Sequence, residues 1–399
     1  MNKKLLFLTL TLLYTGSVFS AASGKQPAEE HPETPAALAS KIDQETDYQQ
    51  EFLKACVFGK IDKIKELINH PNININKEII LPNKSMITPL SIACFNGHTA
   101  IVQALIDYDR IDTTQGLKNA DGTIITPLGL ACENGHTAIV QVLIDYDRTA
   151  RDRIDTTQGQ INANGATNTP LGLACKNGHT ATVQALIDYD RIDTTQGLKN
   201  TDGATMTPLG IACSNYHTAT IQALIAHHRI DTTQGQKYAD GGTITPLGIA
   251  CSNGHTATIQ VLINYARIDH DLIAHDQIDT TQGQINANGG TITPLGLTCF
   301  YGHTATVQAL IAHNRIDTTQ GEKNTNDTTI TPLGIACSKG HTAIVQLLLD
   351  SGASFGRISS NGRNAYQVAR TDEIKELIKQ HAAKTQQSDP ISTEPFKIN

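Results

Sequence analysis

Apolar residues recur along this chain in short blocks at helical spacing, and polar connectors separate the blocks. In the first regular block Ile101, Val102 and Leu105 fall on one side of a predicted helix. Gln103 and Asp107 fall on the opposite side, where they face water. A helix this short is marginal on its own, so another element must cover its apolar stripe.

A second, more apolar helix is predicted just before this one. Thr88 can cap its N-terminus with a side-chain oxygen, and Pro89 suits the first helical position because its missing N–H costs nothing there. Gly97 ends the helix, since glycine readily takes the positive φ found at helix C-termini. The block therefore predicts two helices joined by a turn, and the second helix starts after His98.

The same block occurs seven times. Its Thr-Pro-Leu opening recurs at intervals of 38, 43, 38, 38, 48 and 38 residues, so the period is 38 with two insertions. The opening threonines are Thr88, Thr126, Thr169, Thr207, Thr245, Thr293 and Thr331. A period of about 20–50 residues indicates an array in which each unit is covered by its neighbours. We expect the insertion at 149–153 to form a surface loop, and the one around His270 to form a solvated extension of the preceding helix.

Most of the polar connectors have an Asp-Gly or Asn-Gly pair near their end, which is typical of tight hairpins. The predicted fold is therefore an all-α repeat solenoid, in which stacked helix-turn-helix units carry projecting hairpin-like fingers. The expected boundaries are an N-terminal cap at 48–82, seven full repeats from about 83 to 358, and a C-terminal cap at 359–384. Residues 21–47 are acidic and contain prolines, and residues 385–399 are polar, so both segments are predicted to be disordered.

The repeat resembles the ankyrin repeat over residues 48–384. The resemblance is carried by the Thr-Pro-Leu opening, the Ala-Cys pair first seen at 93–94 and the Asn-Gly-His turn first seen at 96–98. Ser91 or a glycine stands where the family usually has a histidine after Thr-Pro-Leu, and the unit is about five residues longer than the usual 33. The resemblance implies a protein-binding module whose partners lie in the groove between the fingers and the first helices.

Residues 1–20 have the pattern of an export signal. Two lysines precede an apolar run from Leu5 to Leu13, and small residues follow. Cleavage after Ser20 is the preferred prediction, and cleavage after Ala22 also satisfies the small-residue rule. A buried N-terminal helix is the alternative. The leader looks bacterial, so we expect a protein exported to the periplasm or secreted. No later apolar run is long enough to span a membrane, so we expect no span in the mature chain.

The chain has eight cysteines, which an exported protein would ordinarily use in disulfides. Here seven of them lie six residues after the repeat threonine, and the eighth holds the matching place in an irregular first unit. They are Cys56, Cys94, Cys132, Cys175, Cys213, Cys251, Cys299 and Cys337. Equivalent atoms in neighbouring repeats lie about 8–10 Å apart, whereas a disulfide needs Cα atoms within about 7 Å. We therefore predict eight free, buried thiols.

A histidine also recurs once in each repeat. The seven are His98, His136, His179, His217, His255, His303 and His341. One histidine per layer places neighbours about 10 Å apart, too far to converge within about 2 Å of one metal ion. The resemblance implies instead that this residue braces adjacent loops through hydrogen bonds. Asp271 and His275 in the second insertion offer an alternative metal site, but a solvated helix is the better interpretation of that segment.

No sequence motif points to catalysis. The chain has no Gly-Lys-Ser/Thr phosphate loop and no His-Glu-x-x-His zinc motif. We therefore predict that it is not an enzyme and that it binds no metal or other cofactor. The formal net charge of −7 argues against nucleic acid as a partner and makes a basic protein easier to accommodate. We expect a monomer.

The two positions after each repeat cysteine vary while the surrounding core stays fixed, so they supply the predicted partner-binding residues. The set is Phe95, Glu133, Lys176, Ser214, Ser252, Phe300, Tyr301, Ser338 and Lys339. Exposed aromatic side chains such as Phe300 and Tyr301 suit binding hot spots. The alternative is drift on a tolerant surface. Two roles fit: an effector-like module that acts on a host protein, or a periplasmic inhibitor, protector or scaffold of an envelope protein.

Overall fold

The structure of the protein is a computed structural model that describes residues 47–385, except 82, 109, 151–153, 269–280, 314–317 and 357. The described residues all belong to one compact unit of the chain. The predicted export signal, the linker up to residue 46, the C-terminal tail and the insertion around His270 lie outside the described residues. The expectations for those segments stay predictions.

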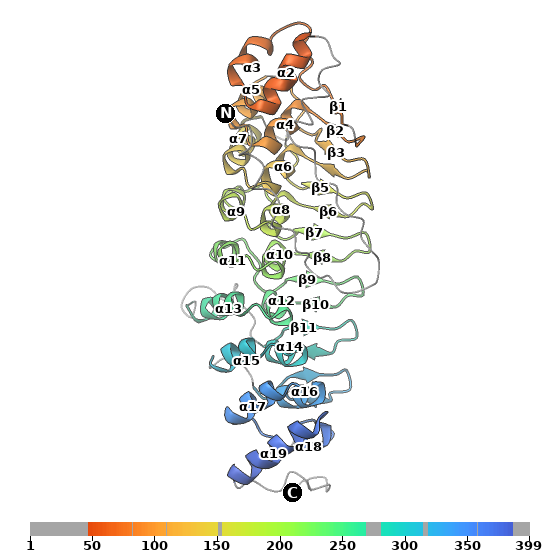
Figure 1. Ribbon diagram of the computed structural model, residues 1–399, viewed down its shortest axis with the longest axis vertical. Coiled ribbons are helices and arrows are strands. Elements are labelled where there is room, and N and C mark those ends of the chain that lie inside the picture. The colour runs from red at the N-terminus through yellow and green to blue at the C-terminus, as the bar shows by residue number, and fades with distance from the viewer. Residues whose placement is uncertain are drawn as a thin grey trace, which may run out of the picture. The chain divides into compact units, whose positions relative to one another are not determined.

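Two columns of helices run side by side through this unit (Figure 1). The first helices of the repeats form one column: α2 (Asp47–Phe58), α4 (Pro89–Asn96), α6 (Pro127–Glu133), α8 (Pro170–Lys176), α10 (Pro208–Ser214), α12 (Pro246–Asn253), α14 (Pro294–Tyr301), α16 (Pro332–Lys339) and α18 (Ala365–Val368). The second helices form the other: α3 (Ile61–Leu67), α5 (Thr99–Ile106), α7 (Thr137–Ala150), α9 (Thr180–Ile187), α11 (Thr218–Ile225), α13 (Thr256–Ile268), α15 (Thr304–Ile311), α17 (Thr342–Asp350) and α19 (Asp372–Thr385). Within each column a helix packs against its neighbours, so the predicted solenoid of stacked helix pairs is confirmed.

Each regular repeat starts its first helix as the sequence predicts. In all seven, the threonine side chain accepts a hydrogen bond from the backbone N–H three residues later, and proline holds the first turn. In α6 the N–H of Gly129 donates to Thr126 Oγ1 at 3.0 Å. Removing such a cap costs about 1 kcal/mol. Gly97, at φ 78°, ends α4 in the left-handed conformation that glycine adopts without strain.

A continuous hydrophobic core runs between the two columns. In α5 the predicted stripe of Ile101, Val102 and Leu105 is at most 1 % exposed. Where a threonine replaces the first residue of this stripe, its buried hydroxyl can bond across to the preceding repeat, as Thr182 does with Thr137 at 2.8 Å. A buried polar group that is satisfied in this way fixes the layers against each other. In the described part of the chain, no helix is both long and apolar enough to cross a membrane.

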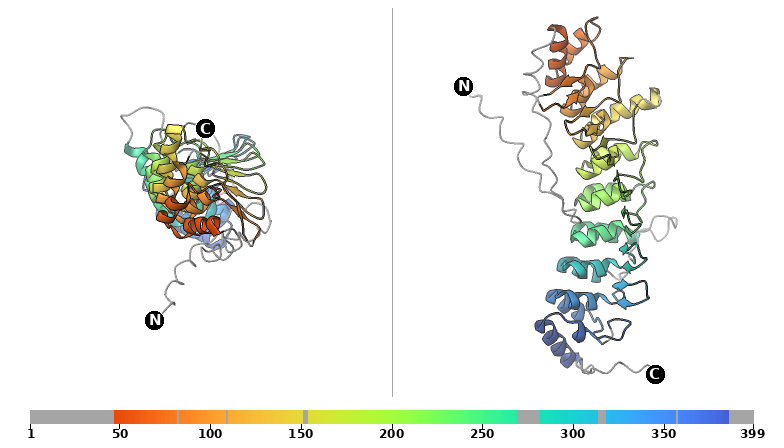
Figure 2. Two further views of the ribbon diagram at one scale, coloured as in Figure 1. Left: turned by 90° about the horizontal axis from the view of Figure 1, so that it is seen from above. Right: turned by 90° about the vertical axis from the view of Figure 1, so that its right-hand side faces the viewer.

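The connectors form hairpins, and the hairpins pair with one another. In the described residues, fourteen two-residue strands follow each other in sequence order in one antiparallel sheet. They are β1 (Ile79–Ile80), β2 (Met86–Ile87), β3 (Leu117–Lys118), β4 (Ile124–Ile125), β5 (Gln160–Ile161), β6 (Thr167–Asn168), β7 (Leu198–Lys199), β8 (Thr205–Met206), β9 (Gln236–Lys237), β10 (Thr243–Ile244), β11 (Gln284–Ile285), β12 (Thr291–Ile292), β13 (Glu322–Lys323) and β14 (Thr329–Ile330). Figure 2 shows the hairpins side by side along one flank of the helices. The fingers were predicted; the pairing between fingers, which joins the backbones of neighbouring repeats, was not.

The two residues of each strand point to opposite faces of this sheet, because strand side chains alternate. One row belongs to the hydrophobic core and includes the buried Ile87, Ile125 and Met206. The other row is turned to water and carries the exposed Lys118 and Lys199. This alternation fixes the register of each hairpin, since a slip of one residue would bury a lysine.

The insertion at 149–153 differs from the predicted surface loop, because α7 continues through its first two residues. The extra helical turn holds Asp147 in a fully buried position, where its carboxylate accepts hydrogen bonds from the Tyr189 hydroxyl at 2.6 Å and from the N–H of Ile154 at 3.1 Å. Arg191 supplies the opposite charge, with Nη1 3.0 Å from a carboxylate oxygen. A carboxylate that is paired and hydrogen-bonded in this way can be buried. Burial raises the pKa of Tyr189 to about 12, and the bond to Asp147 adds to the rise.

Candidate functional site

Six of the seven repeat histidines brace their own repeat against the preceding one. In each, ring atom Nε2 lies 2.9–3.2 Å from the carbonyl oxygen of the residue that follows the cysteine in the preceding unit. The pairs are His98 with Val57, His136 with Phe95, His179 with Glu133, His217 with Lys176, His303 with Ser252 and His341 with Phe300. The bracing role implied by the family resemblance is therefore confirmed. Within the described residues, no three His, Cys, Asp or Glu side chains gather to hold a metal ion.

The glycine that ends a first helix leaves room for the histidine ring of the following repeat. A Cβ atom at Gly254 would lie 2.6 Å from His303 Nδ1, which is closer than a normal contact allows. Gly254 also adopts φ 71°, in the left-handed region. Both space and backbone conformation therefore require glycine at this position.

Tyr216 occupies this glycine position in one repeat and changes the adjacent brace. It adopts φ 65°, which few non-glycine residues do. Its ring contacts the ring of His255, which bonds through Nδ1 instead of Nε2, to the Cys213 carbonyl oxygen at 2.8 Å. His255 is 4 % exposed, and its Nε2 has no hydrogen-bond partner among the described residues. Burial lowers the pKa of His255 from 6.5 to about 4.

All eight cysteines are buried and free, as predicted. Burial raises the pKa of every one of these thiols, to about 12 for Cys337. Because the thiolate is the reactive form, these side chains serve as small apolar groups in the first helices.

The predicted partner-binding residues lie at the C-terminal ends of the first helices. The first helices stand between the second helices and the hairpins (Figure 1). Four of the nine predicted residues are exposed: Lys176, Phe300, Tyr301 and Ser338. Five are half-buried: Phe95, Glu133, Ser214, Ser252 and Lys339. Most of these positions are separated by a full layer, so they form a line rather than one cluster.

Several polar side chains on this line are used within their own helices. Ser252 Oγ donates to the carbonyl four residues earlier at 2.8 Å, and Ser338 Oγ donates to the carbonyl three residues earlier at 2.8 Å. In the first four full repeats the next residue is an asparagine that bonds back in the same way, as Asn96 does at 3.0 Å. These side chains complete the helix and have less to offer a partner.

Phe300, Tyr301 and Lys339 do come together. The two aromatic rings meet edge to face with their centroids 5.1 Å apart. From the next repeat, Lys339 Nζ lies 3.7 Å from the Phe300 ring centroid, a cation–π contact worth about 0.5–1 kcal/mol at an exposed site. Tyr301 is 51 % exposed and Phe300 37 %, so a partner can reach both rings.

Tyr238, on the β9–β10 hairpin, is near enough to Tyr301 for the two phenols to interact electrostatically, and it was not predicted from the sequence. Burial raises its pKa, and the nearby phenol of Tyr301 raises it further. The other hairpins of the full repeats carry an asparagine at this position: Asn119, Asn162, Asn200, Asn286 and Asn324. Tyr301 and Lys339 likewise stand where other repeats have asparagine. Replacement of the repeat asparagine is therefore the sequence feature that could have identified all three residues. We call Tyr238, Phe300, Tyr301 and Lys339 the aromatic patch.

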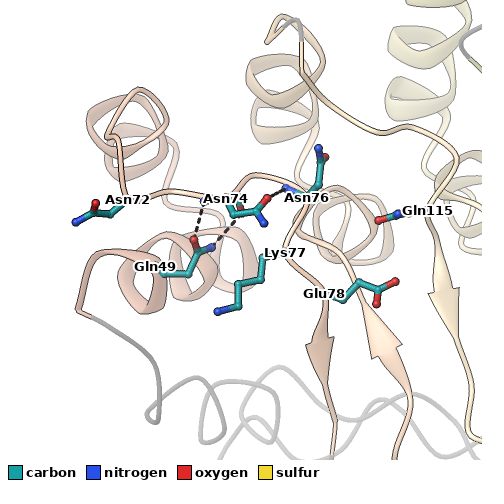
Figure 3. A pocket seen from close by; sticks show the side chains of 7 residues that line it. All are labelled: Gln49, Asn72, Asn74, Asn76, Lys77, Glu78 and Gln115. Atoms are coloured by element: carbon teal, nitrogen blue, oxygen red, sulfur yellow. Dashed lines mark hydrogen bonds between the residues drawn. The ribbon is translucent and has the colours of Figure 1, made fainter.

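A polar hollow beside β1 is a second feature that the sequence did not predict (Figure 3). It has a volume of about 480 Å³ and is lined by Gln49, Asn72, Asn74, Asn76, Lys77, Glu78 and Gln115. The N–H of Asn74 donates to Gln49 Oε1 at 2.8 Å, and Gln49 Nε2 donates to the Asn74 carbonyl at 3.2 Å. The hollow thus lies where the N-terminal helix α2 meets the first connector.

The family described as "Ankyrin repeats (3 copies)" matches residues 52–154, 112–197, 153–236, 195–274, 270–359 and 297–389. The solved structures that are similar include the crystal structure of the ankyrin repeat domain of Bcl-3, described as a unique member of the IkappaB protein family. Its sequence is 19 % identical and the TM-score is 0.46; the match covers 63 % of this chain and 97 % of that chain. No curated protein matches the sequence. Since the family matches together cover more than half of the chain, the chain belongs to the ankyrin-repeat family, whose repeats form a protein–protein interaction module.

Proposed function

We propose that the protein is a non-catalytic module that binds a protein partner through the aromatic patch. The observation that carries the proposal is that Tyr301 and Lys339, two departures from asparagine, both lie beside Phe300 at the ends of first helices, and that a third departure, Tyr238 on a hairpin, is close enough to Tyr301 for the two phenols to interact electrostatically. Aromatic side chains bury a large area with few rotamers to lose, which is why binding hot spots are rich in them. The patch therefore fits an apolar pocket on the partner.

Charge adds a second preference. The formal net charge of −7 favours a partner that is basic overall, because long-range steering depends on the whole surface. Lys339 favours an acidic group at the contact itself. Salt distinguishes the two effects. Added salt weakens the long-range steering by the net charge and so slows association, whereas the local contact of Lys339 is screened less.

The test replaces the patch residues one at a time. Tyr301→Ala and Phe300→Ala should each weaken partner binding by about 1–3 kcal/mol while leaving the helical circular dichroism unchanged. The matched control is Gln141→Ala on the exposed side of α7, which should bind like the unmodified protein. An equal loss from Gln141→Ala would move the site to the second helices and contradict the proposal.

We further propose that the protein is exported. The lysine pair followed by the apolar run from Leu5 to Leu13 supports this. N-terminal sequencing of protein recovered from its native source should begin at Ala21, or at Ser23 if cleavage follows Ala22. Recovery of the intact leader would contradict export.

The two roles can be separated by where the partner is found. An effector-like module would bind a host protein, whereas a periplasmic inhibitor, protector or scaffold would bind an envelope protein. Parallel affinity capture from host-cell lysate and from periplasmic extract addresses this, with the Tyr301→Ala variant beside the unmodified chain. Only a protein that is retained by the unmodified chain and lost with the variant counts as the partner.

A further inference from the structure

Strand β1 has one paired edge and one edge that no strand of the described residues occupies. Among the described residues, β1 pairs only with β2. In this hairpin the N–H of Leu81 donates to the Ser85 carbonyl at 2.7 Å. Because bonded and non-bonded pairs alternate along antiparallel strands, the N–H and C=O of Ile80 point away from β2. The Ile80 side chain is 66 % exposed as well, so this edge presents both backbone groups and an apolar surface.

The corresponding edge is occupied in every later hairpin. β3 is the counterpart of β1 one repeat later, and its Lys118 pairs through that edge with Met86 of β2. The other first strands, β5, β7, β9, β11 and β13, pair in the same way with the preceding hairpin. Where the residue on this edge is isoleucine, as at Ile161 and Ile285, the residue opposite is isoleucine or threonine. The chain itself thus shows what kind of strand the edge accepts.

The first unit does not supply that strand from the equivalent residues. With the period of 38, Tyr48 and Gln49 correspond to Met86 and Ile87 of β2. Tyr48 and Gln49 instead belong to the helix α2, which spans Asp47–Phe58. The residues that form the neighbouring strand in later repeats are therefore helical here.

The surroundings of this edge differ from those at the other end of the sheet. The polar hollow adjoins it, since Lys77 and Glu78 both line the hollow and directly precede β1 (Figure 3). At the opposite end of the sheet β14 is covered, because the N–H of Ser360 donates to the Thr329 carbonyl at 3.0 Å. Exposed apolar edges recruit extended strands from other chains, and proteins usually cover or charge them. The edge of β1, which no strand of the described residues covers, is therefore a candidate binding site.

We propose that β1 accepts an extended segment of a protein partner as an additional antiparallel strand, with a threonine or isoleucine of that segment opposite Ile80. A second copy of the chain fits less well, because α2 and α3 stand beyond β1 at the end of the stack and would meet the other copy first (Figure 1). The site lies several repeats away from the aromatic patch and does not depend on it.

The probe is a synthetic peptide that copies residues 239–246, which contain the second strand Thr243–Ile244. Added to the full chain at millimolar concentration, it should bind saturably and slow the hydrogen exchange of the Ile80 amide. The same peptide N-methylated at Thr243 lacks the N–H that bonds the neighbouring strand and should give no protection. Ile80→Pro removes the open N–H and should weaken peptide binding roughly tenfold or more. Ile80→Lys installs the side chain found at Lys118 and should keep the binding.

Three results would overturn the proposal. If the Ile80 amide is already protected without peptide, the chain's own N-terminal residues or a second copy cover the edge. If the unmodified peptide shows no saturable binding, the edge does not accept a strand. If Ile80→Pro binds the peptide as well as Ile80→Lys does, the peptide lies elsewhere. Should Ile80→Pro fail to fold by circular dichroism, the comparison of the methylated and unmodified peptides decides the question.

Discussion

Replacing Tyr216 with glycine should stabilise the protein, although the change removes a large side chain. The left-handed backbone at φ 65° costs a non-glycine residue about 1–2 kcal/mol. The buried His255 Nε2, which has no hydrogen-bond partner among the described residues, costs about 1–3 kcal/mol more. Against these, glycine gains about 0.5–1 kcal/mol of unfolded-state entropy, and the lost ring contact with His255 removes about 0.5–1.5 kcal/mol. The balance favours Tyr216→Gly by about 1–2 kcal/mol.

The gain should appear first in the layer that carries the change. Stability in a repeat array is close to a sum of unit and interface terms, so hydrogen exchange should slow near residues 207–235 before it slows at either end. The matched control is Gly254→Tyr in the next repeat, which places a Cβ atom 2.6 Å from His303 Nδ1. It should introduce the same defect and lower the unfolding free energy by a similar amount.

The same substitution should reduce the sensitivity of the fold to acid. The pKa of His255 is about 4 in the folded protein, against 6.5 for an unperturbed histidine. As the pH falls through this window the unfolded chain takes up a proton that the folded chain does not, so His255 lowers stability there. In Tyr216→Gly the ring should return to the Nε2 brace of the other repeats, and the pH slope should shrink. Denaturant unfolding at about pH 7 and about pH 4.5 measures both effects, and an unchanged free energy with an unchanged slope would refute the reasoning.

Three further measurements address the rest of the structure. Tyr189→Phe removes a donor from the buried Asp147 and should lower the unfolding free energy by about 1.5–3 kcal/mol in denaturant titration; no loss would mean that the carboxylate finds another donor. Arg229→Lys should speed hydrogen exchange at 187–192, because Arg229 donates to four carbonyls there at 2.8–3.3 Å and lysine lacks the planar fork. Unchanged exchange would show that the four bonds add nothing. Thiol counting should find eight slowly reacting groups that all become reactive in denaturant. Their loss in pairs under native oxidising conditions would contradict the layer spacing.

Features that one repeat determines by itself could be predicted from the sequence. The cap at Thr88 and the helix end at Gly97 depend only on residues within a few positions, so the residue types alone were sufficient to predict both features. The pairing of β2 with β3 depends on how closely two repeats stack, and no single repeat carries that information. The burial of Asp147 could not be predicted from the sequence for a related reason. Its position normally belongs to the polar connector, and it became buried because the insertion after it prolonged α7.

The aromatic patch shows how far the candidate site could be predicted. Phe300 and Tyr301 were selected because they vary at a helix end, and the structure places them in contact. Tyr238 was not selected, since it lies on a hairpin that precedes a different repeat and only the stacking brings it near Tyr301. The serines among the predicted partner-binding residues were selected only because their positions vary. The structure shows that Ser252 and Ser338 donate hydrogen bonds to their own helices, which the sequence alone could not show.

The row of hairpins also determines how the array responds to mechanical load. A stack held together only by helix packing could separate between two layers by parting side chains. Here, separating two repeats also requires breaking the backbone pairing between their hairpins, as between β6 and β7. These hydrogen bonds lie on one flank of the helices, so resistance to opening is greater on the hairpin side than on the side of the second helices (Figure 1). Under tension along the stack, the layers should part first at the second helices, with the sheet acting as the hinge.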